Sequence, residues 1–234
     1  MPYHGQKIKG VIFDLDETII NSLGTYTEAF NTGTRIFGLE PVTDQRIAQF
    51  LDKGFRLGEI LLELFPSVFE EDSRRQACVD AIRKAYLELE AKNVPLKPGV
   101  KRTLQSLRGK KIKIGIVTGR MTTGEGKWLE LRRLNIHQLV DVMVTGAEAP
   151  AKPAPDGLIK CVQELGLSPE ECVFVGDSRV DVIAGKKAGL RTIAVHTGVA
   201  SKELLAREGP DYVLSDLNWL ISYLGELQKT EGGV

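Results

Sequence analysis

The amino-acid sequence predicts an α/β protein with a doubly wound parallel-sheet core and an all-helical domain inserted after the first strand. Three observations lead to this fold class. Short β-branched runs alternate with helical patterns along most of the chain. Apolar residues recur only at helical spacing over residues 24–92, and a segment containing Pro95, Pro98 and Gly99 follows that stretch. Parallel strands joined by helices carry helices on both faces of the sheet.

The first strand is predicted over residues 8–13, an apolar run that is rich in β-branched residues. The helical stretch that follows is punctuated by Pro41 and Pro66 and predicts a small bundle of about four helices. We therefore expect an α/β core with the functional site in residues 1–18 and 97–234. Residues 19–96 are expected to form the helical domain with its two hinges.

From residue 100 onward, helical and strand patterns alternate. Helices are predicted over residues 100–107, 125–134, 155–165, 180–188 and 217–227. Strands are predicted over residues 111–117, 141–144, 172–175 and 192–196, with an edge strand at 212–214.

Composition is that of an ordinary soluble globular protein, with 26% charged and 42% hydrophobic residues among 234. The formal net charge is zero, so no long-range field favours nucleic acid or an anionic membrane. The N-terminal residues 1–7 contain no apolar signal core. The three cysteines show no paired spacing for a metal site. The unpaired cysteines fit a reduced, cytoplasmic setting. The protein is expected to be a monomer or a homodimer, a choice that the sequence does not settle.

Two carboxylates, Asp14 and Asp16, follow the first strand directly. In an extended chain they point to the same face, where they repel each other unless a cation or a proton relieves the repulsion. Such a pair can form a metal site or supply a nucleophile or a general acid. The alternative is a charged turn after a strand, because aspartate also suits turns and helix starts.

Three further segments favour the functional interpretation: Val117-Thr118-Gly119-Arg120, Lys152-Pro153-Ala154-Pro155-Asp156 and Val175-Gly176-Asp177-Ser178-Arg179-Val180-Asp181. With the run around Asp14, and in this order, they resemble the four motifs of the haloacid dehalogenase superfamily, most of whose members are phosphatases. The resemblance covers nearly the whole chain. Since ligands of open parallel sheets bind beyond the carboxyl ends of the strands, we expect the four segments to converge there.

The resemblance implies a role for each matching residue. Asp14 is the expected nucleophile and Asp16 the general acid and base, while Asp14, the backbone carbonyl of Asp16 and Asp177 are the expected ligands of Mg²⁺. The expected phosphate-binding groups are Thr118, Gly119 and Lys152. Asp181 lies one helical turn beyond Asp177 and is expected either to ligate the metal or to hold Lys152.

The helical insert resembles the cap of this family, which selects the substrate. Its loop at residues 51–56 contains Lys53 and Arg56, either of which could bind a substrate carboxylate or a second phosphate. The alternative is a basic surface turn. The other arginines of the motifs, Arg120 and Arg179, are expected to be solvated.

The expected function is therefore magnesium-dependent hydrolysis of a small phosphorylated metabolite, similar to phosphoglycolate, through an aspartyl-phosphate. Pyrophosphatase and sugar-phosphate mutase activities use the same core. No histidine follows Asp16 in the hinge, which favours hydrolysis over the mutase. A phosphonate-cleaving enzyme with Lys53 as Schiff base, a metal-independent dehalogenase and a non-catalytic phospho-acceptor are the remaining alternatives.

Overall fold

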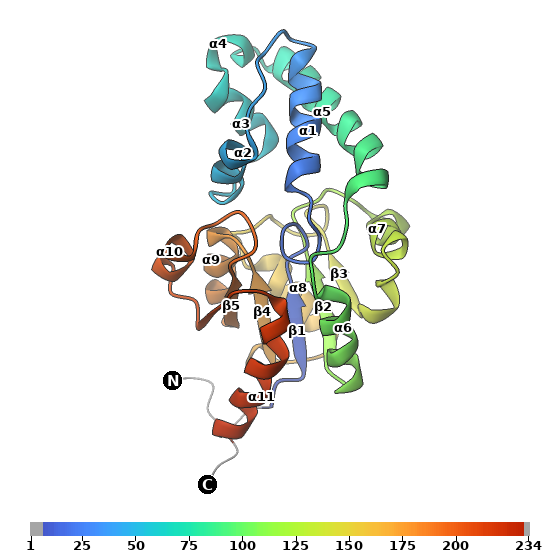
Figure 1. Cartoon of the computed structure of the whole chain (residues 1–234), viewed down its shortest axis with the longest axis vertical. Coiled ribbons are helices and arrows are strands. Elements are labelled where there is room, and N and C mark those ends of the chain that lie inside the picture. The colour runs from blue at the N-terminus through green and yellow to red at the C-terminus, as the bar shows by residue number, and fades with distance from the viewer. Residues whose placement is uncertain (1–6, 232–234) are drawn as a thin grey trace. The chain divides into compact units, whose positions relative to one another are not determined.

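The computed structural model describes residues 7–231 (Figure 1). The chain divides into two compact units. Met1–Ile20 and Leu96–Val234 form one, here called the α/β unit, and Asn21–Pro95 form the other, called the helical unit. Residues 1–6, most of the N-terminal segment considered above, lie outside the described part. Within that part, no helix is both long and apolar enough to cross a membrane.

The α/β unit contains a six-stranded sheet in the order β3-β2-β1-β4-β5-β6. All neighbouring strands are parallel. The strands are β1 (Gly10–Phe13), β2 (Lys113–Val117), β3 (Val142–Val144), β4 (Cys172–Gly176), β5 (Arg191–Val195) and β6 (Tyr212–Leu214). From the central β1 the chain builds the sheet outward on one side and then on the other. The predicted doubly wound fold is thereby confirmed.

Helices cover both faces of this sheet (Figure 1). Helix α6 (Val100–Gly109) packs against β2 and α11 (Leu220–Glu231) on one face, and α8 (Asp156–Leu165) packs against β2 and β3 on the other. Ile12 and Phe174 on the sheet form one buried cluster with Cys161 and Leu165 of α8. The unit is completed by α7 (Leu129–Arg133), α9 (Arg179–Lys187), α10 (Lys202–Arg207) and four short 3₁₀ helices, Gly124–Trp128, His137–Leu139, Pro169–Glu171 and Leu217–Trp219.

The helical unit has five helices, where the sequence predicted about four. They are α1 (Leu23–Arg35), α2 (Asp44–Leu51), α3 (Leu57–Leu64), α4 (Pro66–Phe69) and α5 (Asp72–Asn93). The additional element is α4, a single turn. Phe65 leaves the helical conformation at φ −139° and Pro66 then begins a new turn, because proline suits the first position of a helix. The core of the unit includes Phe30, Ile60 and Phe69, each with no exposed surface.

Close packing of α1 on α5 depends on Gly33. A Cβ atom at this position would lie 2.8 Å from the backbone nitrogen of Ile82 and 2.9 Å from its Cα. Backbone atoms cannot move aside as a flexible side chain can. By contrast, a Cβ at Gly24, at the start of the same helix, would meet nothing within 4 Å.

Alanine substitution at Gly33 and at Gly24 tests this packing. We expect Gly33→Ala to lower the free energy of unfolding of the helical unit by about 1–3 kcal/mol, the usual effect of overpacking. Gly24→Ala, the matched control, should be neutral or stabilising by up to about 1 kcal/mol, because alanine favours the helix. Urea unfolding followed by circular dichroism measures both, and equal stabilities for the two variants would contradict the assignment.

Candidate active site

Three neighbouring strands bring the predicted site residues to one edge of the sheet. Asp14 follows β1, Thr118 follows β2 and Asp177 follows β4, and these strands are adjacent in the order β2-β1-β4. The backbone N–H of Asp14 donates to the carbonyl of Val175 over 2.9 Å, so the site continues directly from the sheet ladder. Residues far apart in the sequence therefore share one location.

Lys152 links two carboxylates of this edge. It lies in the loop before α8, and its ammonium donates hydrogen bonds to Asp14 Oδ1 and, over 2.5 Å, to Asp181 Oδ1. The ammonium also lies 5.6 Å from the centroid of the Phe174 ring. The side chain of Lys152 is only 11% exposed, so the ion pairs form largely out of water.

Asp181 serves both this ion pair and the start of a helix. Its second oxygen, Oδ2, accepts hydrogen bonds from the backbone N–H groups of Asp177 (3.2 Å) and Ser178 (3.0 Å) and from Ser178 Oγ (2.5 Å). The side chain of Ser178 in turn accepts from the backbone N–H of Asp181 at the start of α9. Ser178 and Asp181 therefore form a capping box. The structure shows one of the two roles expected for Asp181, the contact with Lys152.

Asp177 is held by groups from two other segments. Its Oδ1 accepts from Thr18 Oγ1 over 2.7 Å, and its Oδ2 accepts from the backbone N–H of Val199 over 2.9 Å. A Cβ at Gly198 would overlap the same carboxylate. Sequence reasoning assigned no role to Thr18, Gly198 or Val199, because only the fold brings residues 197–199 beside β4.

The carboxylates of Asp14, Asp177 and Asp181 offer oxygen atoms that all lie within 4.8 Å of one another. Burial raises the pKa of Asp14 well above its usual range, and Asp181 and Asp177 raise it further, while Lys152 opposes the shift. Burial and the charge of Asp181 raise the pKa of Asp177 to about 7, against hydrogen bonds from Val199 and Thr18. Burial opposes the charged form of Lys152, but the charges of Asp14 and Asp181 outweigh it and raise its pKa. The cluster therefore has a deficit of positive charge that a divalent cation would fill.

Asp16 lies in a different environment from Asp14. Strand β1 ends at Phe13, so strict alternation does not extend to residue 16. The side chain of Asp16 is 39% exposed, and both of its oxygens accept hydrogen bonds from Arg120. Arg120 was expected to be solvated, and that expectation is wrong: its side chain is 18% exposed and also donates to Glu130. The segment after β2 runs past the turn that carries Asp16, and sequence distance concealed this proximity.

The remaining predicted residues lie in two places. Thr118 is buried at the end of β2, where its Oγ1 accepts from the backbone N–H of Arg120 over 3.3 Å, and Gly119 is exposed beside it. Lys53 and Arg56 belong to the helical unit and are both exposed. Their loop forms a defined turn. Gly54 has φ +79°, and the centroids of the Phe55 and Phe50 rings lie 5.5 Å apart.

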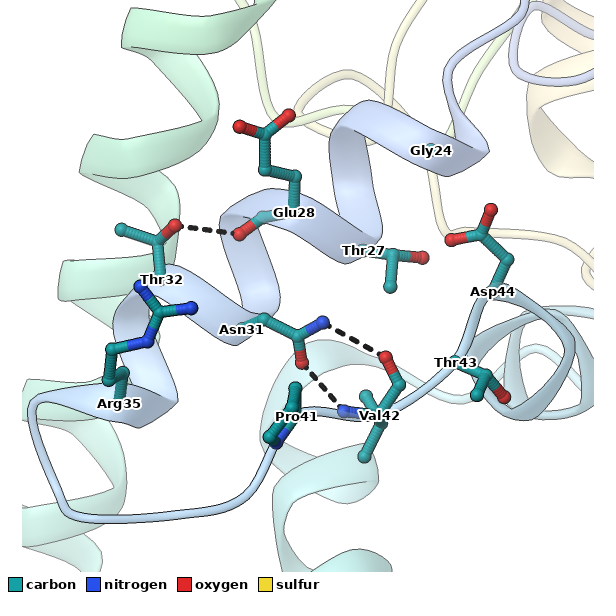
Figure 2. Close-up of a pocket in the computed structure, with 10 residues that line it drawn as sticks. All are labelled: Gly24, Thr27, Glu28, Asn31, Thr32, Arg35, Pro41, Val42, Thr43 and Asp44. Carbon is teal, nitrogen blue, oxygen red and sulfur yellow. Dashed lines mark hydrogen bonds between the residues drawn. The ribbon is translucent and has the colours of Figure 1, made fainter.

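A polar pocket of about 440 Å³ lies within the helical unit (Figure 2). Figure 2 shows Asn31 beside it, where the side-chain amide donates to the carbonyl of Val42 (2.9 Å) and accepts from its N–H (2.8 Å). These bonds fasten the loop before α2 to α1. The pocket is lined by Gly24, Thr27, Glu28, Asn31, Thr32, Arg35, Pro41, Val42, Thr43 and Asp44. None of these is a predicted site residue, so the acidic cluster of the α/β unit remains the candidate active site.

Comparison with known proteins identifies the family. Residues 11–195 match the family model described as haloacid dehalogenase-like hydrolase. A phosphoglycolate phosphatase of Aquifex aeolicus is 29% identical over 208 residues, which cover 88% of this chain and 91% of that protein. PpaX of Clostridium perfringens, whose name gives it as a candidate pyrophosphatase, is 32% identical over 88% of this chain and 92% of its own length.

The fold agrees with this result. A crystal structure of a predicted phosphoglycolate phosphatase from Haemophilus somnus 129pt superposes with a TM-score of 0.83 and covers 92% of this chain and 97% of its own. At 23% identity, that likeness establishes the fold alone. The family model spans most of the chain and includes all four motifs, from Asp14 to Asp181. The chain therefore belongs to the haloacid dehalogenase-like hydrolase family, as its four motifs predicted.

Proposed function

We propose that this hydrolase is a magnesium-dependent phosphatase that hydrolyses a small phosphomonoester, similar to phosphoglycolate, through a phosphoryl group on Asp14. The observation that carries the proposal is the ammonium of Lys152 between Asp14 and Asp181, beside Asp177. A buried carboxylate held by a lysine at the carboxyl edge of a parallel sheet suits nucleophilic attack on an anionic phosphate.

The residues of the acidic cluster fit a magnesium ion. Mg²⁺ prefers hard oxygen ligands and retains several waters, so the carboxylates of Asp14 and Asp177 with the backbone carbonyl of Asp16 would be sufficient. Thr18 and Val199 already orient Asp177, which would limit reorganisation on binding. When bound, the ion would neutralise charge on the phosphoryl oxygens.

The proposed reaction has two successive displacements at phosphorus, and Asp14 and Asp16 act in both. In the first, an oxygen of Asp14 bonds to phosphorus, the ester bond breaks, and Asp16 gives its proton to the leaving oxygen. In the second, water bonds to phosphorus, the bond to Asp14 breaks, and Asp16 takes the proton of the water. Thr118, the backbone at Gly119 and Lys152 would bind the phosphoryl oxygens throughout.

The names of the relatives support a phosphoglycolate-like substrate. Such a substrate carries a carboxylate beside its phosphate, and an exposed cation on the helical unit, Lys53 or Arg56, could bind it. The similarity to PpaX favours pyrophosphate as the second candidate. Comparing kcat/KM for phosphoglycolate and for pyrophosphate distinguishes the two, since the proposal requires the higher value for the carboxylated monoester.

The metal assignment predicts the behaviour of Asp177→Asn, which removes one charge at constant size. We expect activity to fall on the order of 100-fold and to recover in part at high Mg²⁺, because a ligand is weakened while the rest of the site remains. Calorimetry should also show weaker Mg²⁺ binding. Asp80→Asn, on the exposed face of α5, is the control. Full activity of the wild-type protein in EDTA would refute the metal assignment.

The roles of Asp14 and Asp16 can be separated by substitution with asparagine. Asp14→Asn should abolish turnover, because an amide is not a nucleophile. Asp16→Asn should still be phosphorylated by an aryl phosphate, whose leaving group needs no proton, but attack by water should slow. A phosphoryl group should then accumulate on Asp14, detectable by intact mass and located by peptide mapping. Phosphorylation of another residue would show that the roles are wrongly assigned.

Substitution of Lys53 and Arg56 tests whether their loop in the helical unit binds the substrate. If Lys53 or Arg56 binds the substrate carboxylate, alanine at that position should reduce kcat/KM for phosphoglycolate about 10- to 100-fold, the effect of losing a charge-assisted contact. Activity on an aryl phosphate should change little. Lys84→Ala, an exposed lysine of the same unit, is the control. Equal losses on both substrates would indicate that the loop is only a surface turn.

A further inference from the structure

Arg120 contacts Asp16 at two points. Its Nε donates to Asp16 Oδ2 over 2.9 Å and its Nη2 donates to Oδ1 over 2.7 Å. Two parallel hydrogen bonds fix both the position and the plane of a carboxylate, whereas a single bond leaves it free to rotate. The side chain of Asp16 is 39% exposed, so burial alone does not fix its orientation.

Arg120 is itself fixed at both ends. Its remaining terminal nitrogen, Nη1, donates to Glu130 Oε2 over 2.5 Å, and the side chain of Glu130 is only 10% exposed. At the other end, the backbone carbonyl of Arg120 accepts from the N–H of Gly146 over 2.9 Å. The guanidinium therefore lies where the fold places it, and its position is transmitted to Asp16.

We propose that Arg120 is a positioning residue for Asp16, anchored by Glu130, and that it orients the carboxylate of Asp16 for attack by water. This inference rests on the proposed function. A guanidinium that donates to both oxygens fixes the position and the plane of the carboxylate that is to accept the proton. In the second displacement the oxygen of water bonds to phosphorus, the bond to Asp14 breaks, and the proton of the water passes to Asp16. With an aryl phosphate, whose leaving group needs no proton, only this second displacement depends on the orientation of Asp16.

Binding of the substrate phosphate by Arg120 is the less favoured role. Nε and Nη2 are engaged with Asp16, and Nη1 is engaged with Glu130. Glu130 also pairs with Arg133 over 3.3 Å, so two arginines and two carboxylates are linked in one series of ion pairs. Three of the five N–H donors of the guanidinium serve these carboxylates, so a phosphate would compete with two anions for the same cation.

The test follows the phosphoryl group on Asp14. After mixing with an aryl phosphate, Arg120→Met should be phosphorylated at close to the wild-type rate and lose the phosphoryl group about 10- to 100-fold more slowly, as expected for lost charge-assisted bonds. Arg120→Lys should restore little of the rate, because a lysine cannot make two parallel bonds. Full restoration by lysine would overturn the proposal, since charge alone would then suffice.

Arg133→Met is the matched control, because Arg133 lies on α7 and pairs with the same Glu130 that anchors Arg120. It should release the phosphoryl group at close to the wild-type rate. The same loss in Arg133→Met as in Arg120→Met would assign the effect to Glu130 and overturn the proposal. Melting temperatures of all variants check that the fold is intact.

A double-mutant cycle then shows whether Arg120 acts through Asp16. In the Asp16→Asn background, Arg120→Met should have no further effect on release of the phosphoryl group, because the group it orients is gone. Fully additive losses would overturn the proposal and favour direct contact with phosphate. The proposed function fails separately, if Asp14→Asn retains turnover or Asp16→Asn accumulates no phosphoryl group on Asp14.

Discussion

The site depends on one interaction, the ammonium of Lys152 between Asp14 and Asp181. Three carboxylates gather within 4.8 Å at the edge of the sheet, and each is less than a tenth exposed. Removing one partner from a buried ion pair usually costs about 3–5 kcal/mol, because the remaining charge has no counterpart. Lys152 therefore holds together a cluster that burial and mutual repulsion would otherwise separate.

The same residues build the fold and the site. Asp181 uses one oxygen for Lys152 and the other to accept from Ser178 at the start of α9. Because the helix cap and the ion pair share one side chain, the position of Lys152 is tied to the end of β4. The loop at Val199 acts similarly, since its N–H orients Asp177 without introducing a charge.

Asp14 and Asp16 are two residues apart and yet differ in environment. Asp14 is buried against Lys152, and Asp16 lies at partly exposed surface against Arg120. Two carboxylates with separate cations and different burial can take different chemical roles, which a symmetrical pair cannot. The proposed division into nucleophile and acid–base depends on this asymmetry.

The sequence by itself determined the fold class, and it predicted the place of the insertion and the residues expected at the carboxyl edge of the sheet. These follow from local patterns: the hydrophobic period, the strand ends and four short motifs in a fixed order. Only the tertiary structure decided the partners of those residues. Arg120 lies 104 positions from Asp16, and Val199 lies 22 from Asp177. No local pattern records such contacts, because they arise when separate strand ends and loops are brought together by the order of the strands.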